Sequence, residues 1–180
     1  MKRKIRAISF DVGGTLIKPW PSVGHVYAEV AAEYGWPGLS PEKLNEQFGL
    51  AWRRLKNFSH TRVEWAGLVN TTFRGVIAAP PSRAFFSALY QRFADADAWN
   101  IFDDVLPALE ALAERGLKLA VTSNWDRRLI PLLRTLELDA KGESDAYGKV
   151  FAKVPMVGFS TYGEEYIGHI NQTATMVLFR

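Results

Sequence analysis

The apolar positions of this chain follow two periodicities, one typical of buried strands and one of amphipathic helices. Residues 5–10 and 117–121 are short apolar runs, and each predicts a buried strand. Between them, from Ser22 to about Ala96, every periodic segment has helical spacing. The cap and breaker residues place the expected helices at 22–34, 40–56, 62–77 and 82–94.

Helix and strand alternate again after Trp99. A helix is expected over 105–115 and ends at Gly116, and the strand 117–121 leads into a polar turn at 122–124. The next helix should begin at Asp126 and end near Leu136, with Pro131 in its first turn or at a bend. This order predicts an α/β fold with a Rossmann-like parallel sheet, in which 1–18 and 98–180 form the core and 19–97 a helical insertion.

The last forty residues are less regular. The apolar runs 147–151 and 155–159 lie too close together for a parallel crossover, which needs about a dozen residues or more, so they predict one bent strand or a hairpin. Residues 174–179 predict a final strand. An irregular edge of this kind also favours a homodimer formed by strand pairing.

Composition narrows the class of protein. Of 180 residues, 48% are hydrophobic and 23% charged, as in ordinary globular domains. There is no cysteine, which excludes disulfides and thiolate chemistry and fits a cytoplasmic location. No run approaches the ~18 apolar residues of a membrane span. The basic start (Lys2, Arg3, Lys4 and Arg6) reads as a solvated strand entrance rather than a nucleic-acid surface, because no basic stripe recurs downstream.

Candidate chemistry gathers where the two predicted strands end. Asp11 follows the first strand, with Gly13, Gly14 and Thr15 in the turn behind it. Open parallel sheets bind ligands at the carboxyl ends of their strands, and glycine amides can approach an anion closely. A carboxylate beside an anion fits a nucleophile or a metal ligand. Ser123 and Asn124 end the second strand and would add donors to the same anion.

These segments together resemble the haloacid dehalogenase (HAD) superfamily. Residues 10–16 (Phe-Asp-Val-Gly-Gly-Thr-Leu) are similar to its first motif and 119–124 (Leu-Ala-Val-Thr-Ser-Asn) to its second, while 103–109 resemble the helix before the second motif. The interval between the two motifs has the length of the helical cap that many members carry. The resemblance therefore implies a hydrolase of small phosphorylated metabolites with a cap at 19–97.

The resemblance also implies roles for single residues. Asp11 would be a nucleophile that forms an aspartyl-phosphate, Thr15 would stabilise the first loop, and Ser123 would hold phosphoryl oxygens. Mg²⁺ would lie between Asp11, the Gly13 carbonyl and an acid of the fourth motif, for which Glu164 is the candidate. Lys153, with Lys149 as its neighbour, is the candidate for the lysine of the third motif.

Two positions depart from the family's phosphatases. Gly13 stands where they carry a second Asp that protonates the leaving group, and such acid help is worth about 10²–10⁴-fold. Phe159 stands in the first acidic position of the fourth motif, and a phenyl ring cannot bind Mg²⁺. We therefore expect an enzyme of reduced activity that binds Mg²⁺ weakly.

Other interpretations stay open. One is a non-catalytic binding protein, and another is a C–halogen hydrolase of 2-haloacids, which needs neither the second Asp nor a metal. A phosphate loop of the sugar-kinase and actin type ranks last, because Pro19-Trp20-Pro21 and helices follow where a second strand is required. We expect the tryptophans of the insertion (Trp20, Trp36, Trp52 and Trp65) to pack helices rather than to select substrate.

Overall fold

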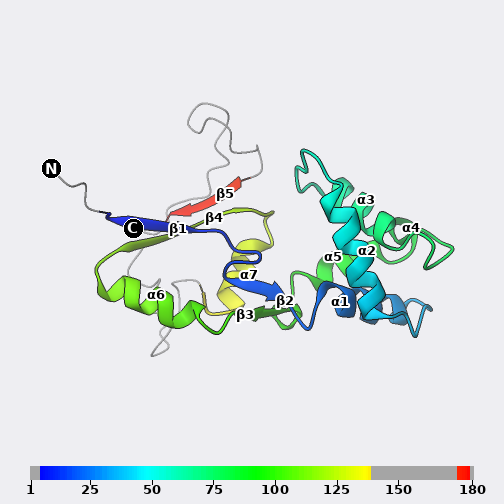
Figure 1. Cartoon of the computed structure of the whole chain (residues 1–180), viewed down its shortest axis with the longest axis horizontal. Coiled ribbons are helices and arrows are strands. Elements are labelled where there is room, and N and C mark those ends of the chain that lie inside the picture. Colours follow the sequence, from blue (N-terminus) through cyan, green and yellow to red (C-terminus); the bar gives the residue numbers. More distant parts are fainter. Residues whose placement is uncertain (1–4, 139–173, 179–180) are drawn as a thin grey trace. The chain divides into compact units, whose positions relative to one another are not determined.

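The computed structural model describes residues 5–138 and 174–178 (Figure 1). Within it the chain forms two compact units, an α/β unit of residues 1–18 and 101–180 and a helical unit, Pro19–Asn100. The chain passes from one to the other at strands β2 (Ile17–Pro19) and β3 (Trp99–Ile101), which form a two-stranded sheet. Each unit is described below by itself.

A three-stranded sheet organises the α/β unit. Strand β4 (Lys118–Asn124) lies between β1 (Ala7–Phe10) and β5 (Ala174–Leu178) (Figure 1). β1 runs parallel to β4, with Phe10 opposite Val121, as the α/β prediction requires. β5 is antiparallel to β4, so the described sheet is mixed rather than wholly parallel.

Two sequence predictions for these strands were wrong in detail. Residues Thr122–Asn124 continue β4 instead of forming a turn, because β5 pairs with them, Ser123 lying opposite Thr175. β1 alternates between exposed and half-buried residues, although a buried strand was expected. Among the described residues β1 pairs with β4 alone, so it is an edge strand of the described sheet.

Helices α6 (Val105–Glu114) and α7 (Leu129–Thr135) flank β4 in sequence, in the predicted order. Val105 and Leu109 are the buried positions of α6, one helical turn apart. The helix ends before Gly116, whose φ of +71° is a conformation that glycine adopts without penalty. Pro131 is the third residue of α7 and therefore lies in its first turn.

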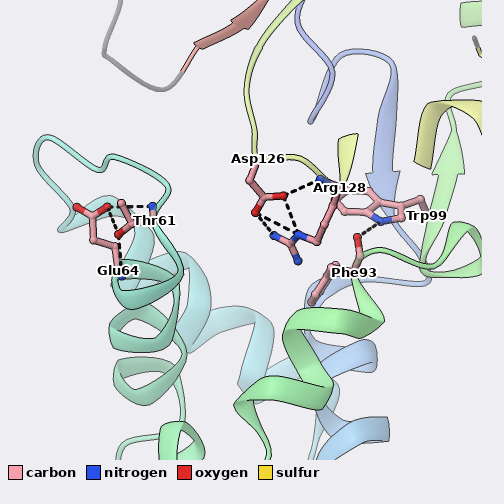
Figure 2. Close-up of polar contacts among 6 residues, drawn as sticks. All are labelled: Thr61, Glu64, Phe93, Trp99, Asp126 and Arg128. Atoms are coloured by element: carbon pink, nitrogen blue, oxygen red, sulfur yellow. Dashed lines mark hydrogen bonds and ion pairs between the residues drawn. The ribbon is translucent and has the colours of Figure 1, made fainter. Parts of the chain in front are cut away.

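The helical unit begins with three helices that have side-chain N-terminal caps, two of them, at Ser22 and Ser40, expected from the sequence. In α1 (Val23–Glu33) and α2 (Pro41–Arg53) the hydroxyls of Ser22 and Ser40 accept backbone N–H groups. In α3 (Arg62–Thr72) Thr61 and Glu64 cap each other reciprocally (Figure 2).

The second half of the helical unit differs more from the prediction. The helix expected over 62–77 ends at Thr72. The helix expected over 82–94 is two short helices, α4 (Pro81–Ala84) and α5 (Phe86–Arg92), broken at Phe85, where φ is −135° and ψ is 6°. A 3₁₀ turn, Ala96–Ala98, leads into β3.

Aromatic side chains form the centre of the helical unit. Tyr27 stacks on Phe73 at a centroid distance of 5.6 Å, and Phe85 meets Phe73 edge-on at 5.4 Å. Burial raises the pKa of the Tyr27 hydroxyl. Each fully buried phenyl side chain contributes about 1.5–3 kcal/mol relative to an exposed one.

The tryptophans of this unit divide into two groups. Trp36 and Trp65 are partly buried and pack against the aromatic core, as predicted. Trp52 is 41% exposed but stacks on Phe48 and Trp65, so it packs as predicted, whereas Trp20 is 49% exposed. Across 5–138 and 174–178, none of the helices combines the length and the apolar character that a membrane crossing requires.

Candidate functional site

The predicted site residues lie in two segments of the α/β unit, the turn after β1 and the end of β4 with the loop behind it, and these segments lie side by side. β1 and β4 are parallel and in register at Phe10 and Val121, so Asp11 and Ser123 both emerge at the carboxyl edge. The Ser123 hydroxyl donates a hydrogen bond of 2.7 Å to Asp11 Oδ1. Ser123 is buried and Asp11 is exposed, so the carboxylate is accessible while its donor is held in place.

The turn after Asp11 is closed by its own backbone. The amides of Thr15, Leu16 and Ile17 all donate to the Val12 carbonyl, at 3.2, 2.8 and 3.1 Å. Gly14 has a φ of +78°, and its amide donates to the Ile17 carbonyl at 2.8 Å. The amides of Gly14 and Thr15 are therefore engaged within the turn, which offers an anion fewer donors than the sequence indicates.

Gly13 faces an aromatic ring from the other loop. A Cβ atom built on Gly13 would lie 3.4 Å from Cζ3 of the Trp125 indole, which is closer than most real Cβ contacts. Trp125 is partly buried and follows Asn124, the exposed last residue of β4. This contact could not be predicted from the sequence, since Gly13 and Trp125 are more than a hundred residues apart.

A carboxylate also fixes the start of the second loop. Asp126 accepts the Arg128 backbone N–H at 3.0 Å, and its two oxygens accept Nε and Nη2 of the same side chain, each at 2.9 Å (Figure 2). Of the two arginines that follow the second motif, Arg128 is thus paired and Arg127 is exposed. Asp126 was expected only to begin a helix, but α7 starts three residues later at Leu129.

The donors available to a cation are hard oxygens. Asp11 offers a carboxylate, and Gly13 lies two residues further along the same turn with its backbone carbonyl. Among the residues that the structure describes, no three His, Cys, Asp or Glu side chains cluster as a metal site would require. Mg²⁺ commonly uses only one or two carboxylates and keeps several waters, so this partial donor set fits it. Glu164 and Lys153 lie outside the described residues.

The remaining expected site residues stand at the edge of this arrangement. The Thr15 side chain is exposed, and its backbone amide supports the turn. Asn124 is paired in the sheet opposite Ala174. The structure thus brings Asp11 and Ser123 into direct contact, with Gly13, Gly14 and Thr15 in the turn after β1 and Asn124 at the end of β4.

A family model and the curated relatives both match haloacid dehalogenase-like hydrolases. A family model described as a haloacid dehalogenase-like hydrolase matches residues 5–154. The "haloacid dehalogenase-like hydrolase domain-containing protein 3" of Danio rerio is 33% identical over 145 residues, which is 74% of this chain and 60% of that protein. The Homo sapiens protein of the same name is 32% identical over 146 residues, 75% of this chain and 58% of that protein.

The chain thus spans about 60% of the length of these curated relatives. Among solved structures, a "predicted phosphoglycolate phosphatase" from Haemophilus somnus 129pt superposes with a TM-score of 0.48 and 20% identity, over 73% of this chain and 57% of that one. The family model covers well over half of the chain and the identity to the relatives exceeds 30%. The chain therefore belongs to the haloacid dehalogenase-like hydrolase family.

Proposed function

We propose that this chain hydrolyses small phosphorylated metabolites, with Asp11 as the nucleophile. The observation that carries the proposal is the 2.7 Å hydrogen bond from Ser123 Oγ to Asp11 Oδ1 at the carboxyl ends of two parallel strands. Ligands of open α/β sheets bind at this edge. A nucleophile needs a defined orientation, and a buried hydroxyl that donates to one oxygen leaves the other oxygen to attack.

The chemistry then has two steps. A carboxylate oxygen of Asp11 attacks phosphorus, and the bond from phosphorus to the leaving oxygen breaks, giving an aspartyl-phosphate. Water next attacks the phosphorus of this intermediate, so that the Asp11 carboxylate and inorganic phosphate are released. The Ser123 hydroxyl, which donates to the Asp11 carboxylate in the structure, would donate to the phosphoryl oxygens once the phosphate is bound. Gly14, in the turn after β1, and Asn124, at the end of β4, are the proposed neighbours of that group.

Mg²⁺ is proposed as the cofactor. The Asp11 carboxylate and the Gly13 carbonyl would hold it, together with Glu164. When bound, the ion supplies positive charge that offsets the repulsion between the carboxylate and the phosphate dianion. With few protein ligands its affinity should be low. Lys153 is proposed to supply further positive charge to the site, and Thr15 to hold the first loop.

A second candidate is the hydrolysis of a C–halogen bond, and Gly13 is the observation that favours it. A halide leaves without needing a proton, so a loop without an ionisable group at position 13 suits this reaction. Asp11 would attack carbon instead of phosphorus. Turnover of 2-chloropropionate in a chelator would support this candidate over phosphate ester hydrolysis.

The deciding experiment is hydrolysis of p-nitrophenyl phosphate with and without Mg²⁺, comparing the wild type with Asp11→Asn. We expect turnover that needs the metal and falls by roughly a thousandfold or more in the variant. Glu110→Gln is the control, because it also turns a carboxylate into an amide but lies on the exposed side of α6. Equal rates for the wild type and Asp11→Asn would refute the proposal.

A further inference from the structure

The two site loops touch at two successive places. Ser123 Oγ contacts Asp11, and two residues further along each loop the Trp125 ring lies against Gly13. The second contact therefore neighbours the carboxylate that we propose as the nucleophile. It has no part in the chemistry described so far.

The indole of Trp125 borders position 13. A Cβ atom there would lie 3.4 Å from Cζ3 of the ring, at the short end of ordinary van der Waals contact, so a side chain at this position would start beside the indole. Gly13 is not among the glycines with positive φ, so its backbone does not by itself require glycine. We infer that position 13 presents an apolar ring beside the nucleophile, since glycine itself supplies no proton donor there.

This arrangement has a consequence for the substrate, which rests on the proposed function. We propose that Trp125 determines specificity and that the site takes phosphate monoesters of flat, acidic hydroxyl groups, namely phenols and enols. In the first step a dianionic ester and the Asp11 carboxylate give the aspartyl-phosphate and the free phenolate or enolate, with no proton transferred. A phenol or enol is acidic enough for its anion to leave without being protonated. The ring or double bond of this leaving group stacks on the indole.

Binding of non-hydrolysable probes tests the stacking without any need for turnover. Phenylphosphonate and methylphosphonate share the phosphonate group and differ in the flat ring, and calorimetry of the full-length chain in Mg²⁺ gives both dissociation constants. We expect the phenyl compound to bind about tenfold more tightly. Trp125→Phe keeps a flat ring and should retain most of this preference, whereas Trp125→Leu keeps apolar volume alone and should lose most of it.

The outcomes separate the two proposals. If Trp125→Leu keeps the full preference for phenylphosphonate, the role of Trp125 is refuted while the anion site stands. If the wild type binds neither phosphonate, the phosphate site itself is refuted, and the specificity proposal with it. Binding of both compounds with equal affinity by the wild type also refutes the specificity role.

A series of substituted phenyl phosphates tests the departure of an unprotonated anion. Without a proton donor, kcat/KM of the wild type should fall by about tenfold or more for each rise of two units in the pKa of the leaving phenol. Trp125→Phe should show the same slope, since neither ring donates a proton to the leaving oxygen. A rate that hardly depends on the leaving group would show that an acid assists it and would overturn this part of the proposal.

Discussion

The two units of this protein differ in what their polar and apolar residues do. In the helical unit, Pro19–Asn100, the large side chains meet in an aromatic core around Tyr27, Phe73 and Phe85. In the α/β unit, polar side chains stand at the ends of two strands, and β1 is half exposed among the residues described. The comparison shows that side-chain packing stabilises the helical unit, whereas single hydrogen bonds position the residues of the candidate site in the α/β unit.

The largest expected effect is a break in the aromatic core. Phe73 is 1% exposed and contacts both Tyr27 and Phe85, so Phe73→Ala should lower the free energy of unfolding by about 3–5 kcal/mol. Urea unfolding followed by circular dichroism measures the change. The matched control is Val63→Ala on α3, where the side chain is 81% exposed and the cost should stay within about 0.5 kcal/mol. Similar losses in both variants would contradict the assignment of this core.

A second prediction compares two hydrogen bonds that join the same pair of strands. Ser123 Oγ to Asp11 Oδ1 and Ser9 Oγ to Thr122 Oγ1 are both 2.7 Å long, but the second is exposed and joins two hydroxyls. A hydrogen bond to a charged group is worth about 1.5–3 kcal/mol, so Ser123→Ala should lower kcat/KM on p-nitrophenyl phosphate by about 10- to 100-fold.

The exposed pair supplies the control. Ser9→Ala removes an equally short bond between the same strands, yet we expect its kcat/KM to stay within about threefold of the wild type, because water replaces an exposed partner at little cost. If both variants lose activity equally, the hydrogen bond to Asp11 has no special part in the reaction.

The sequence predicted most where the signal was local. Ser22 and Ser40 each precede a helical apolar pattern, and each caps a helix in the structure. The prediction was wrong where distant residues decide the conformation. Residues Thr122–Asn124 look like a polar turn, but hydrogen bonding to a strand some fifty residues later makes them part of β4. The single helix predicted over 82–94 breaks at Phe85, whose ring is drawn into the aromatic core.

The candidate site shows the same division. Asp11 and Ser123 were identifiable because each follows an apolar strand, and parallel strands place such residues at one edge. The contact of Trp125 with Gly13 could not be predicted, because it depends on how two turns pack side by side. The pairing of Asp126 with Arg128 is local, only two residues apart, but Asp126 was expected to be the first residue of a helix.

The smallest expected effect concerns the capping box of α3. Its hydrogen bond from Thr61 to the Glu64 carboxylate depends on the charge of that carboxylate, as the hydrogen bond from Ser123 to Asp11 does in the site. Glu64 is partly desolvated, which opposes ionisation, but hydrogen bonds from the backbone of Ser59 and from Thr61 lower its pKa below the ordinary value. Stability from a lowered carboxyl pKa is present at neutral pH and is lost as the pH falls below about 4.3 towards the folded-state pKa. Thr61→Ala should therefore cost about 1 kcal/mol at pH 7, and less at pH 3.

The control for this pH dependence is the same substitution in a Glu64→Gln background. Glutamine still accepts the hydrogen bond of the Thr61 hydroxyl but does not titrate, so the cost of Thr61→Ala should become the same at both pH values. Urea unfolding of the four proteins at pH 7 and pH 3 gives the comparison. A cost that still shrinks at pH 3 with glutamine in place would mean that another acid controls this helix end. A constant cost would assign the acid sensitivity of the α3 cap to Glu64, since its hydrogen bonds with Thr61 close the box.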